Sequence, residues 1–253
     1  MKDATLRLGS VLLLAGLLLA WELACRWLAV PPLVLPPPSA IGRALWQGLA
    51  SGYFWPHLAA TSLELLLGVL AGSLLGFGAG LLLGEHPTLR RLLMPYVVAS
   101  QVVPKLALAP LFVLWFGFGM TSTVVITALI CFFPLMENTL TALQQVPPER
   151  LELFRMLGAT RAQTLWRLKL PQGLPAILAG LRVAVVLALV GAVVGEFIGA
   201  SQGLGALVIA TQGTMDTALM FAVLVLIAGL GMLAYHATLL LERWLLLPFT
   251  RLS

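Results

Sequence analysis

The sequence predicts an all-α, polytopic membrane protein with about six transmembrane helices and short cytoplasmic helices between them. Hydrophobic residues make up 60% of the chain and charged residues 10%, whereas an average soluble domain has about 25% charged residues. The mean hydropathy is +1.01. Six apolar runs reach the roughly 20 residues that a helix needs to cross the hydrocarbon of a bilayer. No run alternates like a barrel strand.

The expected spans divide the chain into three parts. Residues 1–57 form an N-terminal transmembrane helix and an external linker, residues 58–243 form a transmembrane core, and residues 244–253 form a cytoplasmic tail. A polar insert at 145–175 interrupts the core. The spans are expected at 8–28, 58–84, 92–116, 121–143, 176–199 and 218–241.

The first apolar run also resembles a signal peptide, because Lys2 and Arg7 precede it. However, the run continues to Val30 without a small-x-small cleavage site, and Glu22 stands where a lipoprotein site ahead of Cys25 has an aliphatic residue. We therefore expect residues 8–28 to be retained as a span. The other cysteine, Cys131, falls deep in the fourth span, so neither a disulfide with Cys25 nor a metal site is expected.

The distribution of Lys and Arg predicts the orientation. Eleven of them fall before the first span, after the second, in the insert or after the last span, and two, Arg26 and Arg43, fall on the other side. Cytoplasmic loops retain the positive excess. Both termini are therefore expected in the cytoplasm, with 30–57, 117–120 and 200–217 outside. The glycine-rich external segment 199–213 suits a gate, a contact for a binding protein or a plain loop.

The second span carries a ridge without side chains. Gly68, Gly72, Gly76 and Gly80 recur at intervals of four residues, so they share one face of a helix. Such a face lets another helix approach closely. It serves packing inside the subunit or, alternatively, a dimer contact or sliding surface.

The third span combines prolines with an unexpected charge. Pro95, Pro104 and Pro110 remove backbone donors and favour a broken helix, and Lys105 lies about 20 Å into the membrane, counted from Arg91 at 1.5 Å per residue. Non-helical backbone at that depth is tolerated where it is buried in protein or faces water. We therefore expect this span to line a translocation pathway. Lys105 either contacts substrate, snorkels, or pairs with a carboxylate.

Charged residues inside spans are functional candidates in general. The carboxylates that Lys105 could meet are Glu64 and Glu196. We assign to the expected pathway Pro104, Lys105, Pro110, Arg182 and Glu196.

The insert predicts two short helices on the cytoplasmic face. Pro147 and Pro148 end the preceding helix and start one over 149–157, which Gly158 closes. Thr160 and Gln163 form a capping-box pattern that starts a second helix, which Pro171 is expected to stop. Neither helix is long enough to span a membrane.

The first of these helices is amphipathic. Leu151, Phe154 and Leu157 repeat every three residues, and charged residues cover the rest. The stripe serves either to rest the helix on lipid or on its own bundle, or to dock a soluble partner. Both alternatives use the same pattern.

The insert contains Glu152, Leu153, Phe154, Arg155, Leu157, Gly158 and Ala159, then Leu170, Pro171 and Pro175. At these residues the chain resembles the EAA loop of the permease subunits of bacterial ABC importers, with Leu153 and Phe154 in place of the two alanines of that loop. The resemblance extends over about residues 58–243, through the runs 104–111, 114–119, 132–134, 138–139, 180–182, 195–197 and 203–205. These runs resemble the subfamily that imports nitrate, sulfonates, taurine and pyrimidine precursors of thiamine.

The resemblance implies a complex in the bacterial inner membrane. Two permease copies would form a homodimer, two cytoplasmic ABC ATPase subunits would bind ATP and Mg, and an external binding protein would deliver a small anionic or heteroaromatic solute. No cofactor is expected on this chain. The resemblance assigns ATPase coupling to Leu151, Glu152, Phe154, Arg155, Leu157, Gly158 and Ala159.

Other functions find little support. The chain lacks a G-x-x-x-x-G-K-[ST] sequence, so ATP hydrolysis is expected on another subunit, and it has no catalytic acid pair, serine–histidine set or H-E-x-x-H motif. The pI of 9.8 comes from basic loops between spans and not from a nucleic-acid-binding motif. The alternatives are a secondary transporter or channel driven by an ion gradient, which would need neither ATP nor a partner chain, and a structural membrane anchor.

Overall fold

The structure, a computed structural model, describes residues 2–250, and within them every regular element is a helix. Residues 251–253 of the expected tail, with Arg251, lie outside the described residues, as do the side chains of Lys2 and Arg7. The long helices are α1 (Lys2–Trp27), α3 (Trp55–Glu85), α6 (Met120–Gln144), α9 (Leu170–Gly199) and α11 (Thr217–Thr250). The last helix takes in most of the expected tail, residues 244–250.

The prediction of about six spans is confirmed. Five helices of the described chain are long and apolar enough to cross a membrane. A bent pair adds a sixth when it is counted as one span: α4 (Pro87–Val102) is followed by a 3₁₀ turn (Lys105–Leu108) and α5 (Ala109–Phe116), with an 80° bend between the two parts. The break falls at Pro104 as predicted, whereas Pro95 lies inside α4 and Pro110 lies in the first turn of α5.

The centre of the molecule is a layer of three packed helices, α3, α6 and α9. The glycine ridge of α3 faces α6. A Cβ built on Gly72 would lie 2.7 Å from Cβ of Cys131, and one on Gly80 would lie 2.6 Å from Cβ of Thr139. Real Cβ atoms do not approach so closely, so these positions require glycine. The interpretation of the ridge as packing inside the subunit is confirmed.

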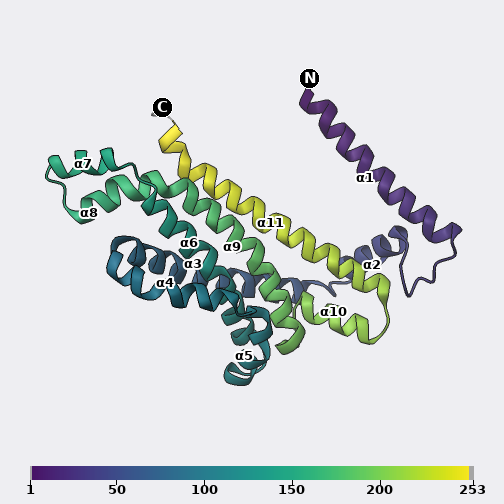
Figure 1. Ribbon diagram of the computed structural model, residues 1–253. Coiled ribbons are helices and arrows are strands. Elements are labelled where there is room, and N and C mark those ends of the chain that lie inside the picture. The colour runs from purple at the N-terminus through teal and green to yellow at the C-terminus, as the bar shows by residue number, and fades with distance from the viewer. Residues whose placement is uncertain (1, 251–253) are drawn as a thin grey trace.

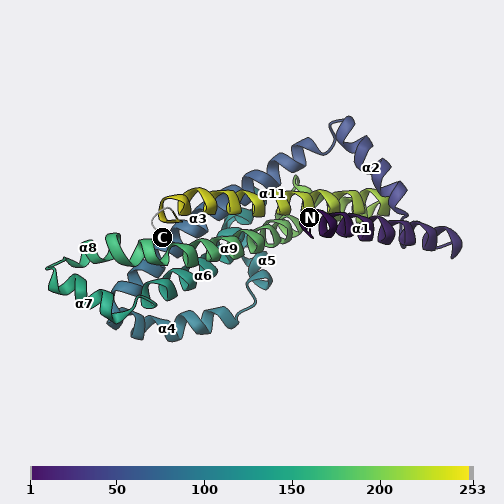
Figure 2. The ribbon, with the colours of Figure 1, turned by 90° about the horizontal axis from the view of Figure 1, so that it is seen from above.

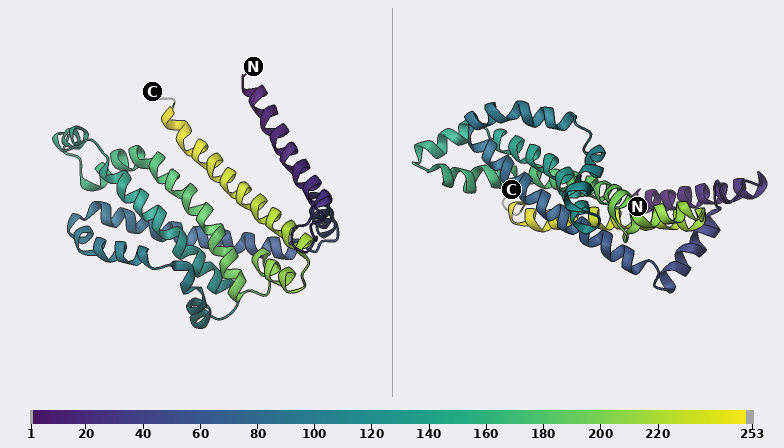
Figure 3. Two further views of the ribbon diagram at one scale, coloured as in Figure 1. Left: turned by 45° about the vertical axis from the view of Figure 1, so that its right-hand side comes forward. Right: turned by 90° about the horizontal axis from the view of Figure 1, so that it is seen from below.

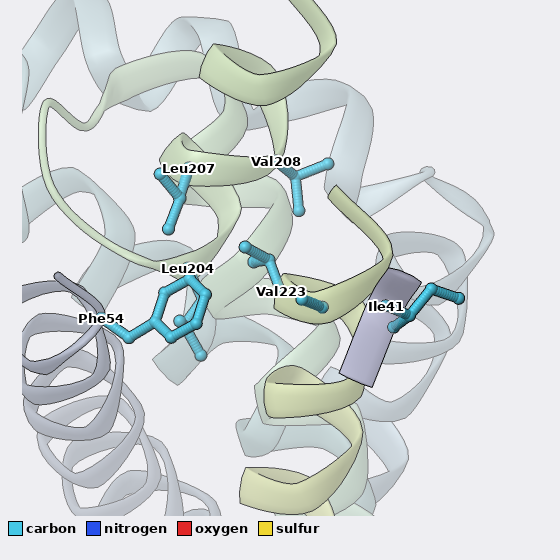
Figure 4. Packing of buried hydrophobic residues seen from close by; sticks show 7 residues of the cluster. Ile41, Phe54, Leu204, Leu207, Val208 and Val223 are labelled. Carbon is cyan, nitrogen blue, oxygen red and sulfur yellow. The ribbon is translucent and has the colours of Figure 1, made fainter. Parts of the chain in front are cut away.

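The segment 199–213 is not a plain loop. It contains α10 (Leu204–Gly213), and the cluster around it holds Phe54, buried Val223 of α11 and Ile41 of α2 (Pro38–Ala50). Figure 4 shows Leu204, Leu207, Val208 and these side chains converging. The sequence missed this core because α10 is short and flanked by glycines.

The helix α1 lies apart from the rest along most of its length, and it meets the molecule near α2 (Figure 3). Its contacts are concentrated at its C-terminal end, where Trp21 packs edge-on against Phe221 at 6.1 Å. There Glu22 accepts hydrogen bonds from Ser39 and pairs with Arg26.

The two described ends of the chain, the α3–α4 turn and the polar insert lie at one end of the long helices (Figure 1). The α2 helix, α10 and the α5–α6 turn lie at the other end. Seen from above, the insert projects beyond the bundle (Figure 2). The chain therefore has the two-sided distribution of loops that the charge count predicted.

The glycine ridge can be tested by adding one methyl group. Gly72→Ala should lower the thermal unfolding midpoint of the purified protein, because overpacking against the α6 backbone costs about 1–3 kcal/mol. The matched control is Gly78→Ala in the same helix, where nothing lies within 4 Å of the added Cβ. Equal midpoints for the two variants would contradict the packing described.

Candidate functional site

The first short helix of the insert is α7 (Pro148–Met156), one residue earlier at each end than predicted. Pro148 occupies its first turn, where a missing N–H costs nothing. At its end the N–H of Gly158 donates to Arg155 O and the N–H of Ala159 donates to Phe154 O, both at 3.0 Å. This is the Schellman pattern. Gly158 has φ +69°, which explains the glycine.

The apolar stripe predicted on α7 is divided in the structure. Leu151 and Phe154 are half-buried, whereas Leu157 is 72% exposed. Leu157 instead belongs to a second apolar face with Leu153 and Met156, which is 80% exposed. We call Leu153, Met156 and Leu157 the exposed face of α7. Their spacing of i, i+3 and i+4 was the signal in the sequence that could have found it.

The half-buried side of α7 is attached to the bundle. Arg150 Nη1 donates to Gln172 Oε1 at 3.2 Å, linking α7 to the start of α9. Lys169 pairs with Glu85 at 2.6 Å, linking the same region to the end of α3. The remaining coupling candidates, Glu152 and Arg155, are exposed. The insert is therefore joined to α9 through α7 and to α3 through Lys169.

The second short helix begins as predicted and ends differently. Thr160 and Gln163 form a complete capping box, with N–H to side-chain distances of 3.2 and 2.8 Å, at the start of α8 (Arg161–Thr164). The prediction that Pro171 stops this helix is wrong. A π-helical turn (Leu165–Lys169) joins α8 to α9, and Pro171 falls in the first turn of α9. The widened turn accommodates a residue that has no N–H to donate.

The break in the third span leaves Lys105 beside a ring and not beside a carboxylate. Its Nζ lies 4.2 Å from the ring centroid of Phe133, a cation–π distance. The ion pairs of the described residues are Arg26–Glu22, Lys169–Glu85 and Arg182–Glu242. An ion pair of Lys105 with Glu64 or Glu196 is therefore not formed.

Beside Lys105 lies an open hollow of about 310 Å³. Two of the five predicted pathway residues, Pro104 and Lys105, line it, together with Gln101 and with Leu187 of α9. Pro110 is exposed at the start of α5. The hollow thus presents one ammonium group and one amide among apolar side chains.

The other two predicted pathway residues lie elsewhere. Arg182 Nε lies 3.1 Å from Glu242 Oε2 of α11, an ion pair by distance that is not aligned as a hydrogen bond. Glu196 is 1% exposed and points into the interior of the subunit. Its Oε1 accepts a hydrogen bond from Thr61 at 2.6 Å, and its Oε2 accepts one from the Gly205 N–H.

Comparisons with known proteins agree with this arrangement. Residues 68–246 match the family described as "Binding-protein-dependent transport system inner membrane component". The chain is 37% identical to the formylaminopyrimidine transport permease protein ThiX of Halalkalibacterium halodurans, over 99% of both chains. It is 38% identical to the riboflavin transport system permease protein RibX of Chloroflexus aurantiacus, over 94% of this chain and 89% of that protein.

Two further comparisons concern a sulfonate and the fold. The chain is 35% identical to the taurine transport system permease protein TauC of Escherichia coli, over 94% of this chain and 86% of that protein. Its fold resembles a chain of the MetNI methionine ABC transporter in an inward-facing conformation, with a TM-score of 0.65 and 21% identity, over 76% of this chain and 97% of that one. The chain therefore belongs to the family of inner membrane components of binding-protein-dependent transport systems, as a permease subunit of an ABC importer.

Proposed function

We propose that two copies of this chain form the membrane part of an importer that is driven by two cytoplasmic ABC ATPases and supplied by an external binding protein. The observation that carries the proposal is the exposed face of α7. Leu153, Met156 and Leu157 are uncovered on a short helix that projects from one end of the spans. Exposed apolar side chains in water favour a protein partner. Two closing ATPases need two such helices, which a two-fold pair supplies.

The proposed orientation places α7 and both termini in the cytoplasm of a bacterial inner membrane. The positive-inside rule supports it, since eleven Lys and Arg residues fall on that side and two on the other. ATP and Mg would bind on the partner ATPases. This chain would contribute no catalytic group.

The proposed mechanism is alternating access. Closure of the ATPases on ATP would draw the two α7 helices together, and hydrolysis would release them. The attachments of α7 support transmission of this movement, because Arg150 bonds to α9 through Gln172, and the Lys169–Glu85 pair joins the start of α9 to α3. The helix α9 would then transmit the movement of α7 across the membrane.

The proposed solute is small and either anionic or heteroaromatic. Relatives of the chain are named for riboflavin and formylaminopyrimidine, which are heteroaromatic, and for taurine, a sulfonate. Lys105 and Phe133 support this class, because an ammonium attracts an anion and a ring stacks on a flat solute. The hollow that Lys105 borders opens beside the broken span.

Docking through the exposed face of α7 can be tested by placing one charged side chain in the proposed contact with the ATPase. Met156→Asp should reduce co-purification of the ATPase at least about tenfold, because an unpaired carboxylate in an apolar contact is costly. The control is Met215→Asp, since Met215 is 71% exposed and belongs to the turn between α10 and α11, and α10 lies at the opposite end of the spans. Unchanged co-purification for Met156→Asp would reject this docking face.

The role of Lys105 can be tested by transport assays on the full complex in proteoliposomes. Lys105→Met should lower ATP-dependent uptake of a solute that carries an anionic group, such as the sulfonate of taurine, about tenfold or more, because a bond to a charged group contributes about 1.5–3 kcal/mol. Lys105→Arg should keep most of the uptake, since arginine retains the charge and also stacks on rings.

Taurine and formylaminopyrimidine would serve as the probe solutes, with co-purified ATPase as the control for assembly. Uptake by Lys105→Met at the level of the unchanged protein, for both solutes, would exclude a solute contact at Lys105.

A further inference from the structure

Two carboxyl groups lie side by side in the membrane without a cation. Glu64 of α3 is 2% exposed and Glu196 of α9 is 1% exposed. Thr61 lies one turn before Glu64 on α3 and donates to Glu196 at 2.6 Å, which places both carboxyl groups at the same contact between α3 and α9. Glu64 lies nine residues past the start of α3, or about 14 Å along the helix. The pair therefore lies in the half of the bundle that carries α2 and α10, next to the start of α10.

The hydrogen bonds around Glu196 identify it as the ionised member. The N–H of Leu204 donates to Thr61 Oγ1 at 2.8 Å, so the hydroxyl proton of Thr61 is free to be donated to Glu196 Oε1. The N–H of Gly205 donates to the other oxygen, Oε2. A carboxylate whose two oxygens each accept a hydrogen bond is stabilised in its charged form.

Glu64 has the opposite surroundings. Its Oε2 is buried and has no hydrogen-bond partner among the described residues. An isolated ionised carboxylate in such a place is very costly, and it usually takes up a proton instead. When Glu64 is protonated, its carboxyl group is neutral and can donate a hydrogen bond, so the cost of burying a charge is removed.

Among the described residues, the elements packed around the pair form no ion pair with it. On α3 the other titratable neighbour is His57, whose Nδ1 lies 3.0 Å from the oxygen and 3.2 Å from the nitrogen of Gly203, so the ring bonds to the backbone ahead of α10. The helices α5 and α10 contain no charged residue, and α6 offers Thr123 and Thr127. On α11 the charged residues Glu242 and Arg243 lie near the opposite end of the helix. Lys105 is placed over Phe133.

We propose that Glu64 and Glu196 form a single-proton site, with the proton on Glu64 and the negative charge on Glu196. Two ionised carboxylates at one buried contact repel each other, because little water is present to screen their charges. One shared proton removes this repulsion and leaves Glu196 charged, which its two donors require. The inference does not depend on the transported solute.

Hydrogen bonds to Thr61 and Glu196 connect the start of α10 to α3 and α9. Gly205 approaches Glu196 so closely that an added Cβ would lie 2.9 Å from Glu196 Cβ, and Gly203 has φ +132°, a conformation that favours glycine. The start of α10 therefore depends on the charged Glu196, and α10 in turn holds α2 and α11 through its apolar cluster. Loss of the proton from Glu64 would add a second negative charge and weaken the connection between α10 and the central helices.

Infrared spectroscopy of the purified complex can detect the proton directly. The protein should show, at neutral pH, the carbonyl-stretch band of one protonated carboxylic acid, and this band should shift in deuterated water. Glu64→Gln should abolish the band while the protein stays folded, since the amide replaces a neutral acid. The control is Glu149→Gln, an exposed residue of α7, which should leave the band unchanged.

A stability measurement supplies a second readout. The folded pair holds one proton more than the unfolded chain, in which both groups ionise at neutral pH, so stability should fall as the pH rises through the loss of that proton. Glu64→Gln should remove this alkaline loss. Absence of the band in the unchanged protein would overturn the proposal, and so would its persistence in Glu64→Gln or an equal alkaline loss in both proteins.

Discussion

The close approach of helices at glycine is the constraint on which the rest of the structure depends. Lipid is as apolar as the side chains, so helices in a membrane associate by van der Waals packing and not by a hydrophobic drive. The helix α6 has glycines on both sides. The ridge of α3 contacts it on one side, and Gly180 and Gly195 of α9 contact it on the other, where an added Cβ would lie 2.5 Å from Asn138 Cβ and 3.0 Å from Thr123 Cγ2.

This packing determines how a movement of the polar insert would reach the central helices. The insert connects α6 directly to α9, two helices that the glycines of α9 hold close together. Because α8 continues through the π-helical turn into α9, no flexible hinge separates the end of α8 from the membrane. A short helix attached in this way moves with the central layer. An amphipathic helix that rested on lipid without such an attachment would not move with the central layer.

The sequence predicted features that depend on local chemistry. The apolar runs, the closing Gly158 and the capping box of Thr160 depend on neighbours within a few residues, so the sequence alone contains their cause. It failed where an uncommon turn or distant residues decide. Pro171 continues a helix because the preceding turn widens, and α10 forms because α2, α3 and α11 cover it.

The candidate pathway shows the same division. Sequence reasoning found Lys105, Arg182 and Glu196 as charges inside spans, because a charge there is costly whatever surrounds it. It could not find their partners, since Phe133, Glu242 and Thr61 come from other helices. The exposed face of α7 was missed for a different reason. Its spacing is visible in the sequence, but which of two apolar stripes turns toward the bundle depends on tertiary contacts.

The charges within the spans are compensated in three different ways, and the difference bears on function. Arg182 has the carboxylate of Glu242, and Glu196 has a hydroxyl and a backbone donor. Lys105 has a neutral ring, which stabilises a cation without cancelling its charge. Of the two cations inside spans, Lys105 is therefore the one that keeps its full attraction for an anion. Lys105 also lies where the backbone is broken and beside a hollow, which supports the proposed contact with a solute.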